Sequence, residues 1–266
     1  MKIKPRGYQI SWFNLVLIVL GGFALLFIVG PVLGMFLHSS PVKVLETVHD
    51  KEVQASIFRT LAIAFIGTLF FSIFAVPFAY ILARKEFIGK RLITSIIDLP
   101  VIIPHTAAGI AVLGIISRDS LIGKGAGLLG FQFVGHPAGI ALAMGFVSIP
   151  FLINAARDGF LNVPVRYEKA ALNLGASPIQ GFFTISLPMA WKNVISGFVM
   201  MFGRGMSEFG AVVIVAYHPL TTPVLIFERF TEFGLSYAQP VAVIFILICL
   251  LVFILLRLLS VKKVAR

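Results

Sequence analysis

The sequence predicts an all-α membrane protein with six transmembrane helices, both termini in the cytoplasm, and a two-helix cytoplasmic loop between spans four and five. Hydrophobic residues make up 59% of the chain and charged residues only 12%, whereas soluble domains average about 45–50% and about 25%. The apolar residues form long blocks, and the basic residues gather at the ends of alternate blocks. A water-soluble monomer could not hide this much apolar surface, so lipid is the expected solvent.

The apolar blocks are close to the length of about 20 residues that a helix needs to cross the hydrocarbon core. Five blocks contain no Asp, Glu, Lys or Arg, and a sixth contains one Arg and one Glu. The predicted spans are 12–37, 60–83, 99–117, 138–156, 194–216 and 238–256. The first block follows a basic start, as in a secretory signal, but it is longer than a signal's apolar region and has no clear cleavage site. We therefore expect residues 1–266 to form a single transmembrane domain.

The placement of Lys and Arg orients the spans through the positive-inside rule. The side of the two termini carries 15 of these residues and the opposite side carries six. The first side holds Lys2, Lys4, Arg6, Arg84, Lys85, Lys90, Arg91, Arg157, Arg166, Lys169, Lys192, Arg257, Lys262, Lys263 and Arg266. The other holds Lys43, Lys51, Arg59, Arg118, Lys124 and Arg229. Both termini are predicted to be cytoplasmic, in a multi-pass protein of the cell membrane. Because the basic residues are not gathered on one domain, the net charge of +11 does not indicate a nucleic-acid partner.

The predicted cytoplasmic loop, Arg157 to Asn193, contains helix signals of its own. Pro164 is suited to the first position of a helix, and Gly175 can end that helix in a left-handed conformation. Ser177 and Pro178 have the pattern of an N-cap and first residue of a second helix, which the Leu187-Pro188 pair is expected to terminate. The loop is therefore predicted to be a helix, a tight turn and a second helix.

The chemistry of the first loop helix favours a protein contact. Ala170 and Ala171 permit close approach of another surface, and Arg166, Glu168 and Lys169 supply polar groups around them. A short helix laid in a groove of a partner is a common docking arrangement.

Two other interpretations of the loop are weaker. Tyr167, Phe182 and Phe183 could anchor it at the lipid headgroups. A helix-turn-helix DNA reader has a similar outline, but tethering between two spans leaves no free recognition domain.

The spacing of three short motifs in the loop resembles the EAA signature of ABC-importer permeases. Lys169-Ala170-Ala171, Gly175 and Ile185-x-Leu187-Pro188 stand at the spacing of E-A-A, three residues, Gly, nine residues and I-x-L-P. Lys169 replaces the usual Glu, and Glu168 stands next to it. The resemblance implies that the loop contacts an ATPase subunit. The implied coupling residues are Glu168, Lys169, Ala170, Ala171, Gly175, Ile185, Leu187 and Pro188.

Two further stretches indicate a substrate class by resemblance. Residues 98–106, Asp-Leu-Pro-Val-Ile-Ile-Pro-His-Thr, resemble a segment of molybdate and tungstate permeases, and residues 207–211, Ser-Glu-Phe-Gly-Ala, resemble a segment shared with sulfate permeases. The resemblance implies import of a tetrahedral oxyanion, molybdate or tungstate, with sulfate or thiosulfate as the alternative. It also implies a second copy of this chain, two ATP-binding cassette subunits and an external substrate-binding protein.

The chain has no Gly-rich phosphate loop of the form G-x-x-x-x-G-K-[ST], so ATP and Mg²⁺ are expected on the partner ATPase and the permease is not expected to be an enzyme. We predict no cofactor or metal in this chain. A proton-coupled secondary transporter that uses Glu208 or Asp98 as a relay is a rival from a different class, but it leaves the loop pattern unexplained.

The predicted membrane interior contains a small set of polar and helix-breaking residues. Arg204 and Glu208 are four residues apart, on one helix face, as an element of the translocation path or a structural ion pair. Pro100 and Pro104 are expected to bend or interrupt span three near its cytoplasmic end, and Asp98 to cap that break or pair with a cation. His105 is expected to be a packing or pore residue rather than a metal ligand. The path or gate candidates are Asp98, Pro104, His105, Arg204, Ser207, Glu208, Phe209 and Gly210.

Overall fold

The chain is helical and contains no strand throughout residues 12–262, the part that the computed structural model describes. Five helical segments are long and apolar enough to cross a membrane, and α4 with α5 forms a sixth candidate. The elements are α1 (Trp12–His38), α2 (Pro41–His49), α3 (Lys51–Arg84), α4 (Lys90–Ile102), α5 (His105–Ile116), α6 (Leu121–Leu128), α7 (Pro137–Leu161), α8 (Val165–Asn173), α9 (Pro178–Gly181), the π-helix η1 (Phe182–Ser186), α10 (Leu187–Met206), α11 (Gly210–Val215), α12 (Thr222–Phe233) and α13 (Leu235–Lys262).

Four of the six predicted spans are single helices, namely α1, α3, α7 and α13. The largest difference is at the start of α3, which begins at Lys51 rather than at residue 60. Its N-cap is Asp50, whose carboxylate accepts hydrogen bonds from the backbone N–H groups of Glu52 and Val53. The helix therefore extends beyond the apolar block, because helix ends are fixed by capping and not by hydropathy.

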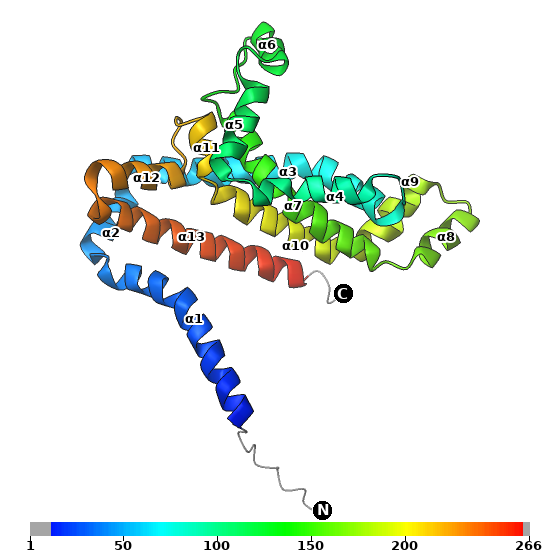
Figure 1. Cartoon of the computed structure of the whole chain (residues 1–266), viewed down its shortest axis with the longest axis horizontal. Helices are drawn as coiled ribbons and strands as arrows, with labels where there is room; N and C mark the ends of the chain where they lie inside the picture. Colours follow the sequence, from blue (N-terminus) through cyan, green and yellow to red (C-terminus); the bar gives the residue numbers. More distant parts are fainter. Residues whose placement is uncertain (1–11, 263–266) are drawn as a thin grey trace, which may run out of the picture.

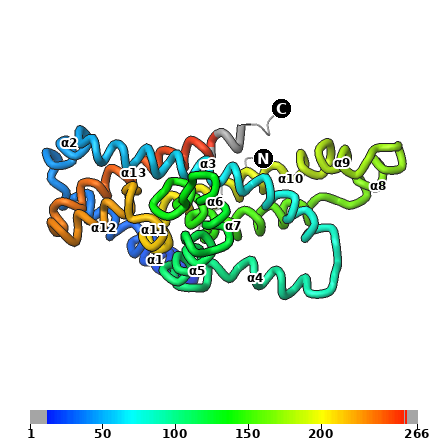
Figure 2. The backbone as a smooth tube through the Cα atoms, turned by 90° about the horizontal axis from the view of Figure 1, so that it is seen from above, coloured from blue at the N-terminus to red at the C-terminus, as the bar shows by residue number. Residues whose placement is uncertain are grey.

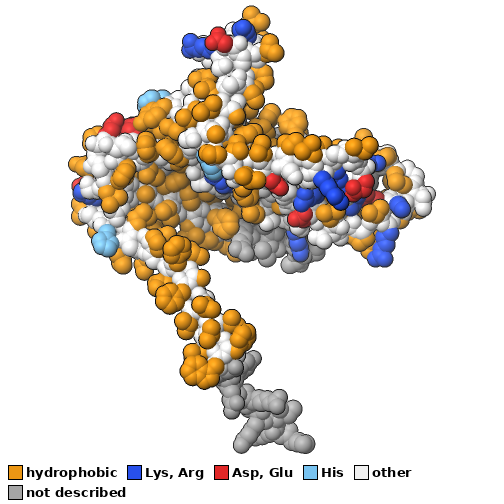
Figure 3. All heavy atoms as spheres, in the orientation of Figure 1, with side chains coloured by type: hydrophobic (Ala, Val, Ile, Leu, Met, Phe, Trp, Pro, Cys, Tyr) orange, Lys and Arg blue, Asp and Glu red, His pale blue; other side chains and the backbone are white. Residues whose placement is uncertain are grey.

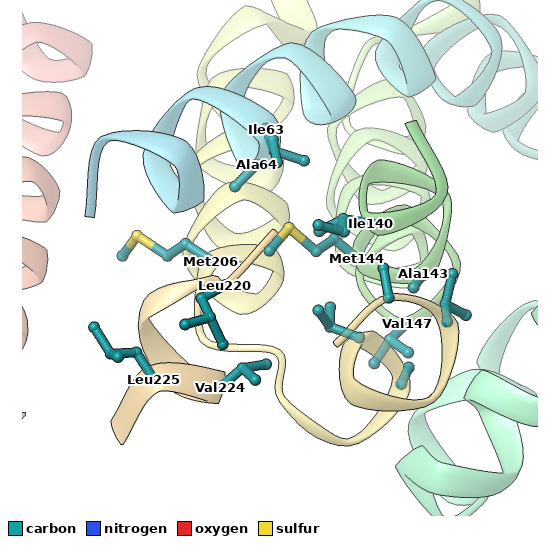
Figure 4. Close-up of a cluster of buried hydrophobic side chains, with 14 of the residues drawn as sticks. Ile63, Ala64, Ile140, Ala143, Met144, Val147, Met206, Leu220, Val224 and Leu225 are labelled. Carbon is teal, nitrogen blue, oxygen red and sulfur yellow. The ribbon is translucent and has the colours of Figure 1, made fainter. Parts of the chain in front are cut away.

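The helices α3, α7 and α10 form the centre of an elongated bundle, with α13 beside α10 (Figure 1). Gly145 of α7 allows close contact with α3, because a Cβ at this position would lie 2.1 Å from the ring of Phe71. Two clusters of buried apolar side chains fill the bundle. Figure 4 shows part of the larger cluster, where Ile63, Ile140, Met144 and Met206 meet between α3, α7 and α10.

The two ends of the bundle differ in character. The end formed by α2 and α12 lies opposite the end formed by α8 and α9 in both views (Figures 1 and 2). In the space-filling view, hydrophobic side chains cover much of the visible middle, and acidic and basic side chains gather toward the α8 and α9 end (Figure 3). This arrangement is expected of helices that cross lipid and emerge into water at their ends.

Spans three and five, which were predicted as 99–117 and 194–216, are each broken into two helices. The chain bends by 112° between α4 and α5, and the break lies at Ile103 and Pro104. The predicted interruption of span three is confirmed, but it does not lie near the cytoplasmic end of the span. Because α4 begins at Lys90, the break falls in the middle of the α4–α5 pair. Helices α10 and α11 are separated by residues 207–209.

Two parts of the chain stand away from the bundle. Helix α1 has no buried residue and diverges from the other spans (Figure 1). Helices α5 and α6 project to one side, across the direction of α4 (Figure 1). The terminal basic residues used in the orientation prediction, within 1–11 and 263–266, lie outside the described residues.

Candidate functional site

The first loop helix, α8, has the predicted extent. Pro164 is its N-cap, rather than its first helical residue, and Leu174 its C-cap. Gly175 has a φ of 89°, and its N–H donates to the carbonyl of Leu172, while the N–H of Ala176 donates to that of Ala171. These bonds satisfy carbonyl groups at the helix end, as in other left-handed C-terminal caps.

The second loop helix starts as predicted but does not stop where predicted. Ser177 caps α9, and its side chain and that of Gln180 form a reciprocal capping box. The expected termination at Leu187-Pro188 is wrong, because α9, η1 and α10 follow one another without a break and Pro188 lies in the first turn of α10. Pro188 is thus inside one helical run, Pro178–Met206, and the π-helical turn directly before it is the kind of local adjustment that accommodates a proline within a membrane helix. The loop is therefore continuous with a membrane span.

The surface of α8 carries a shallow apolar groove of about 390 Å³. Ala170 and Ala171 line it with small side chains. Tyr167, Leu174, Thr184, Ile185 and Met189 complete its lining. The groove thus joins α8 to η1 and α10, and it contains three of the predicted coupling residues. Lys169 is exposed at the surface of α8.

Glu168 does not project into solvent with Lys169. Its Oε1 accepts hydrogen bonds from Arg84 Nε at 2.8 Å and Arg84 Nη2 at 2.7 Å. Ser186 Oγ donates to the same oxygen at 2.7 Å, and Tyr80 Oη donates to Oε2 at 3.2 Å. We refer to Glu168, Arg84, Tyr80 and Ser186 as the Glu168 cluster. It joins α8 to the end of α3 and to the last residue of η1.

The Glu168 cluster is largely shielded from water. The side chains of Arg84 and Glu168 are 8% and 13% exposed, and Ser186 is fully buried. Burial opposes ionisation of Glu168, but hydrogen bonds from Arg84, Ser186 and Tyr80, together with the charge of Arg84, outweigh it and lower the pKa of the carboxyl group. The pair is therefore charged at neutral pH.

The second candidate site lies where the two broken spans meet. Glu208 is 1% exposed, and its Oε2 lies 2.8 Å from Arg204 Nη2 and 2.8 Å from His105 Nδ1. Its Oε1 accepts a hydrogen bond of 2.8 Å from the backbone N–H of Ala211. We refer to His105, Arg204 and Glu208 as the midbundle cluster. The predicted contact between Arg204 and Glu208 is confirmed, and His105 joins it.

The midbundle cluster is held by the ends of the broken helices. His105 is the first residue of α5, directly after Pro104, and Gly210 is the first residue of α11. A Cβ on Gly210 would lie 2.7 Å from the Cβ of His105, so the two helix starts pack against each other. Phe209 stacks near Phe227, with ring centroids 4.9 Å apart, and Ser207 is exposed beside Arg204.

The midbundle cluster braces the two breaks, and it leaves the guanidinium group of Arg204 partly exposed. Discontinuous helices near the middle of a membrane commonly form ion sites in transporters, because their ends carry unpaired backbone dipoles. The side chains of His105 and Arg204 are 39% and 25% exposed. Glu208 balances the charge of Arg204 inside the protein, so a structural role and a role in the path are compatible.

Asp98 differs from its prediction. It lies within α4 and accepts a hydrogen bond of 2.6 Å from Asn154 Nδ2 of α7, so it neither caps the break nor makes one of the ion pairs found in the described part of the chain. Within residues 12–262, no group of three or more His, Cys, Asp or Glu side chains could hold a metal ion.

Sequence reasoning missed Arg84, Tyr80 and Ser186 as partners of Glu168, and Asn154 as the partner of Asp98. These residues are 18 to 88 positions away along the chain. The only signal was their chemistry: an Arg at the end of a predicted span is normally assigned to the lipid headgroups.

Comparison with known proteins identifies the chain's family. Residues 75–264 match the family described as binding-protein-dependent transport system inner membrane component. The chain is 42% identical over 246 residues to the molybdate/tungstate transport system permease protein WtpB of Thermococcus kodakarensis, covering 92% of this chain and 94% of that protein. It is 30% identical over 253 residues to the sulfate transport system permease protein CysT of Synechococcus elongatus, covering 92% and 88%.

A solved structure shares the fold. A bacterial ABC transporter involved in the import of alginate contains a chain that superposes with a TM-score of 0.73 at 14% identity, covering 96% of both chains. The sequence matches a permease family over most of its length. The same sequence forms the broken spans and the loop that continues into α10. The chain belongs to the family of binding-protein-dependent transport system inner membrane components, the permease subunits of ABC importers.

Proposed function

We propose that this permease imports molybdate or tungstate, powered by ATP hydrolysis on separate subunits that dock on the loop 157–193. The observation that supports the substrate best is the 42% identity with a molybdate/tungstate permease over nearly the whole of both chains. The sulfate permease is more distant at 30%, so sulfate or thiosulfate is the second candidate.

The coupling loop supports docking of an ATPase subunit. The groove beside Ala170 and Ala171 is apolar and open, and exposed apolar side chains flank it, with Leu174 at 89% and Ile179 at 71% exposure. Large exposed apolar side chains gathered at a polar end of a membrane protein indicate a protein contact. In this arrangement the loop and both termini lie in the cytoplasm, and the partner ATPase holds the ATP and Mg²⁺.

A second copy of the chain is the proposed partner within the membrane. Helix α1 is apolar and has no buried residue, so it needs either lipid or another protein surface along its whole length. An apolar groove of about 580 Å³ between α10, α12 and α13, which includes Met206, Phe245 and Cys249, is open on the outside of the bundle. With two copies, two ATPase subunits complete the transporter, and an external binding protein delivers the ion.

The midbundle cluster is the proposed position of the gate or path. It lies between the two ends of the bundle, at the breaks of α4–α5 and α10–α11, where helix ends can shift without disrupting a full span. A permease that held its ion tightly would release it slowly, so we expect selection by the binding protein and only weak contacts here. A proton relay through Glu208 is the rival from a different class, but it gives no role to the groove on the loop.

The function is tested by reconstituting the permease with its cognate ATPase and binding protein in liposomes. Uptake of labelled molybdate should require ATP on the side of the membrane that the ATPase subunits face. ATP hydrolysis should rise when the binding protein carries molybdate or tungstate. Sulfate should compete only at much higher concentration. Uptake that follows a proton gradient without the ATPase would contradict the proposal, and preferential sulfate uptake would favour the second candidate.

Docking is tested separately with Ala170→Trp, which adds a large side chain to the lining of the groove. We expect this variant to lose co-purification with the ATPase while keeping its own thermal stability. Asn173→Trp is a matched control, because Asn173 is exposed on the same helix but does not line the groove. Equal loss in both variants would argue against the groove as the docking surface.

A further inference from the structure

We infer that Glu168 is the positioning residue that transmits motion of the coupling helix α8 to the membrane spans α3 and α10. The inference rests on the proposed docking of an ATPase on this loop. The usual expectation for an acidic residue beside Ala170 and Ala171 is a contact with the ATPase itself. The geometry indicates a different role, inside the permease.

Four hydrogen bonds from α3 and η1 hold the Glu168 carboxylate inside the permease. Arg84 is the last residue of α3, and Tyr80 lies one turn earlier on the same helix. Ser186 is the last residue of η1, directly before α10. Arg84 Nη2 also donates to the carbonyl of Val163 at 3.0 Å, in the segment that precedes α8. A displacement of α8 must therefore move the ends of α3 and α10 with it, or break these bonds.

The hydrogen bonds between Arg84 and Glu168 are charge-assisted and mostly buried, so breaking them is costly. Two guanidinium N–H groups of Arg84 reach one carboxylate oxygen, and charge-assisted hydrogen bonds are about twice as strong as neutral ones. Both side chains are mostly buried, and separating a buried pair leaves uncompensated charges. The ring of Tyr80 packs against Phe160 and Phe182, with centroids 5.3 and 4.9 Å away. The site is therefore a rigid connection, unlike a solvent-exposed ion pair.

The connection leads to the midbundle cluster. Helix α10 runs without a break from Leu187 to Met206, and Arg204 lies about 27 Å along it from Ser186 at the usual rise per residue. The π-helix η1 stands between α9 and α10, and such segments often mark functional positions in helices. Motion of α8 can thus reach Arg204 through one continuous helix.

Other acidic residues at the same end do not share this geometry. Glu86 pairs with Lys90 at 2.6 Å, but its side chain is 88% exposed. Asp158 pairs with Arg157 at 3.4 Å and is 59% exposed. Exposed pairs of this kind contribute little to stability, and both are formed by residues close together along the chain. Among these acidic residues, Glu168 is the one that joins the coupling loop to a different span.

The test uses the complete transporter in liposomes and compares wild type with Glu168→Gln and, as a matched control, Glu86→Gln. We expect Glu168→Gln to keep co-purification with the ATPase and ATP hydrolysis, while molybdate transported per ATP falls by about 5-fold or more, the lower end of typical coupling between sites. Glu86→Gln should equal wild type in all three measurements. An unchanged transport ratio in Glu168→Gln would overturn the inference, as would loss of co-purification alone, because that would place Glu168 on the docking surface.

A rescue experiment separates a mechanical role from a loss of folding. In a Cys249→Ser background, Arg84→Cys and Glu168→Cys are combined and then joined with a short thiol-specific cross-linker. The uncross-linked double variant should be uncoupled, and the cross-linked protein should recover most of its transport per ATP. Failure of the cross-link to restore coupling would overturn the inference. Failure of the proposed function itself would differ, because wild type would then show no ATP-dependent uptake.

Discussion

Arg204 and Glu208 form an ion pair of 2.8 Å across the end of α10, with Arg204 inside the helix and Glu208 just beyond it. The pair therefore fixes the direction in which the chain leaves α10. Because Glu208 also binds His105 and the N–H of Ala211, one buried carboxylate determines how both broken spans lie relative to each other.

Removal of Arg204 should cost more than removal of both members of the pair. Arg204→Met leaves the carboxylate of Glu208 buried with a partner missing, and we expect a loss of about 3–5 kcal/mol in the free energy of unfolding. Arg204→Met combined with Glu208→Gln leaves no unpaired carboxylate and should lose less than Arg204→Met alone. Thermal unfolding in detergent measures this double-mutant cycle. Additive losses would show that the two side chains do not interact in the protein.

Gly210→Ala should destabilise the junction of the broken spans. The added Cβ would lie 2.7 Å from the Cβ of His105, so α5 and α11 must move apart at a cost of about 1–3 kcal/mol. Gly203→Ala provides the control, because a Cβ there meets nothing within 4 Å. Thermal unfolding of both variants, with ATP-dependent uptake measured in parallel, checks this expectation. Equal stability of the two would contradict the packing at Gly210.

Gly175→Ala should weaken the turn between the two loop helices. Gly175 has a φ of 89°, and a left-handed conformation costs a residue with a Cβ about 1–2 kcal/mol. We expect weaker co-purification with the ATPase but little change in thermal unfolding of the membrane spans. Gly181→Ala is the matched control, since it adds the same atom in open space to a helical residue of the same loop. A Gly175 variant that binds the ATPase as well as wild type would argue against a required turn geometry.

The charged form of Glu168 should stabilise the fold at neutral pH, and this contribution should be lost only in acid. Its pKa is lowered from the usual 4.5 because the hydrogen bonds from Arg84, Ser186 and Tyr80 outweigh burial. A carboxyl group with a lowered pKa in the folded state stabilises the fold fully above its unfolded pKa, and the contribution disappears as the pH falls through the folded pKa.

The difference in thermal unfolding between wild type and Glu168→Gln should therefore be constant from about pH 8 to about pH 5.5 and decrease below 4.5, near the usual range of a glutamate pKa. Unfolding scans in detergent across this range measure the difference. A difference that already decreases between pH 7 and pH 6 would mean that the carboxyl group is not held in its charged form.

Several features of the fold could be predicted from the sequence because they depend on local patterns. The length and polarity of the apolar blocks located α1, α3, α7 and α13. Ser177 and Gly175 predicted a helix start and a helix end in the loop, since capping is decided by a few consecutive residues. Pro104 predicted the break in span three.

Other features needed contacts between distant segments. The continuation of α9 through η1 into α10 was missed because Pro188 looks like a terminator, whereas the π-helical turn η1 before it accommodates a proline inside a continuous helix. The break after Met206 was missed because it covers only residues 207–209 and the chain is apolar again in α11. Hydropathy has no information about which helix ends pack together.

The sequence by itself determined that this chain spans a membrane several times and that capped helices begin after Pro164 and Ser177, because apolar length and capping residues act locally. The tertiary structure alone decided that Glu168 turns inward to Arg84, Tyr80 and Ser186, and that His105 meets Arg204 and Glu208. Apart from Arg204 and Glu208, which are four residues apart, the side chains that pair in these two clusters are 18 to 103 residues apart. A buried charge must find its partners wherever the packing of the helices places them.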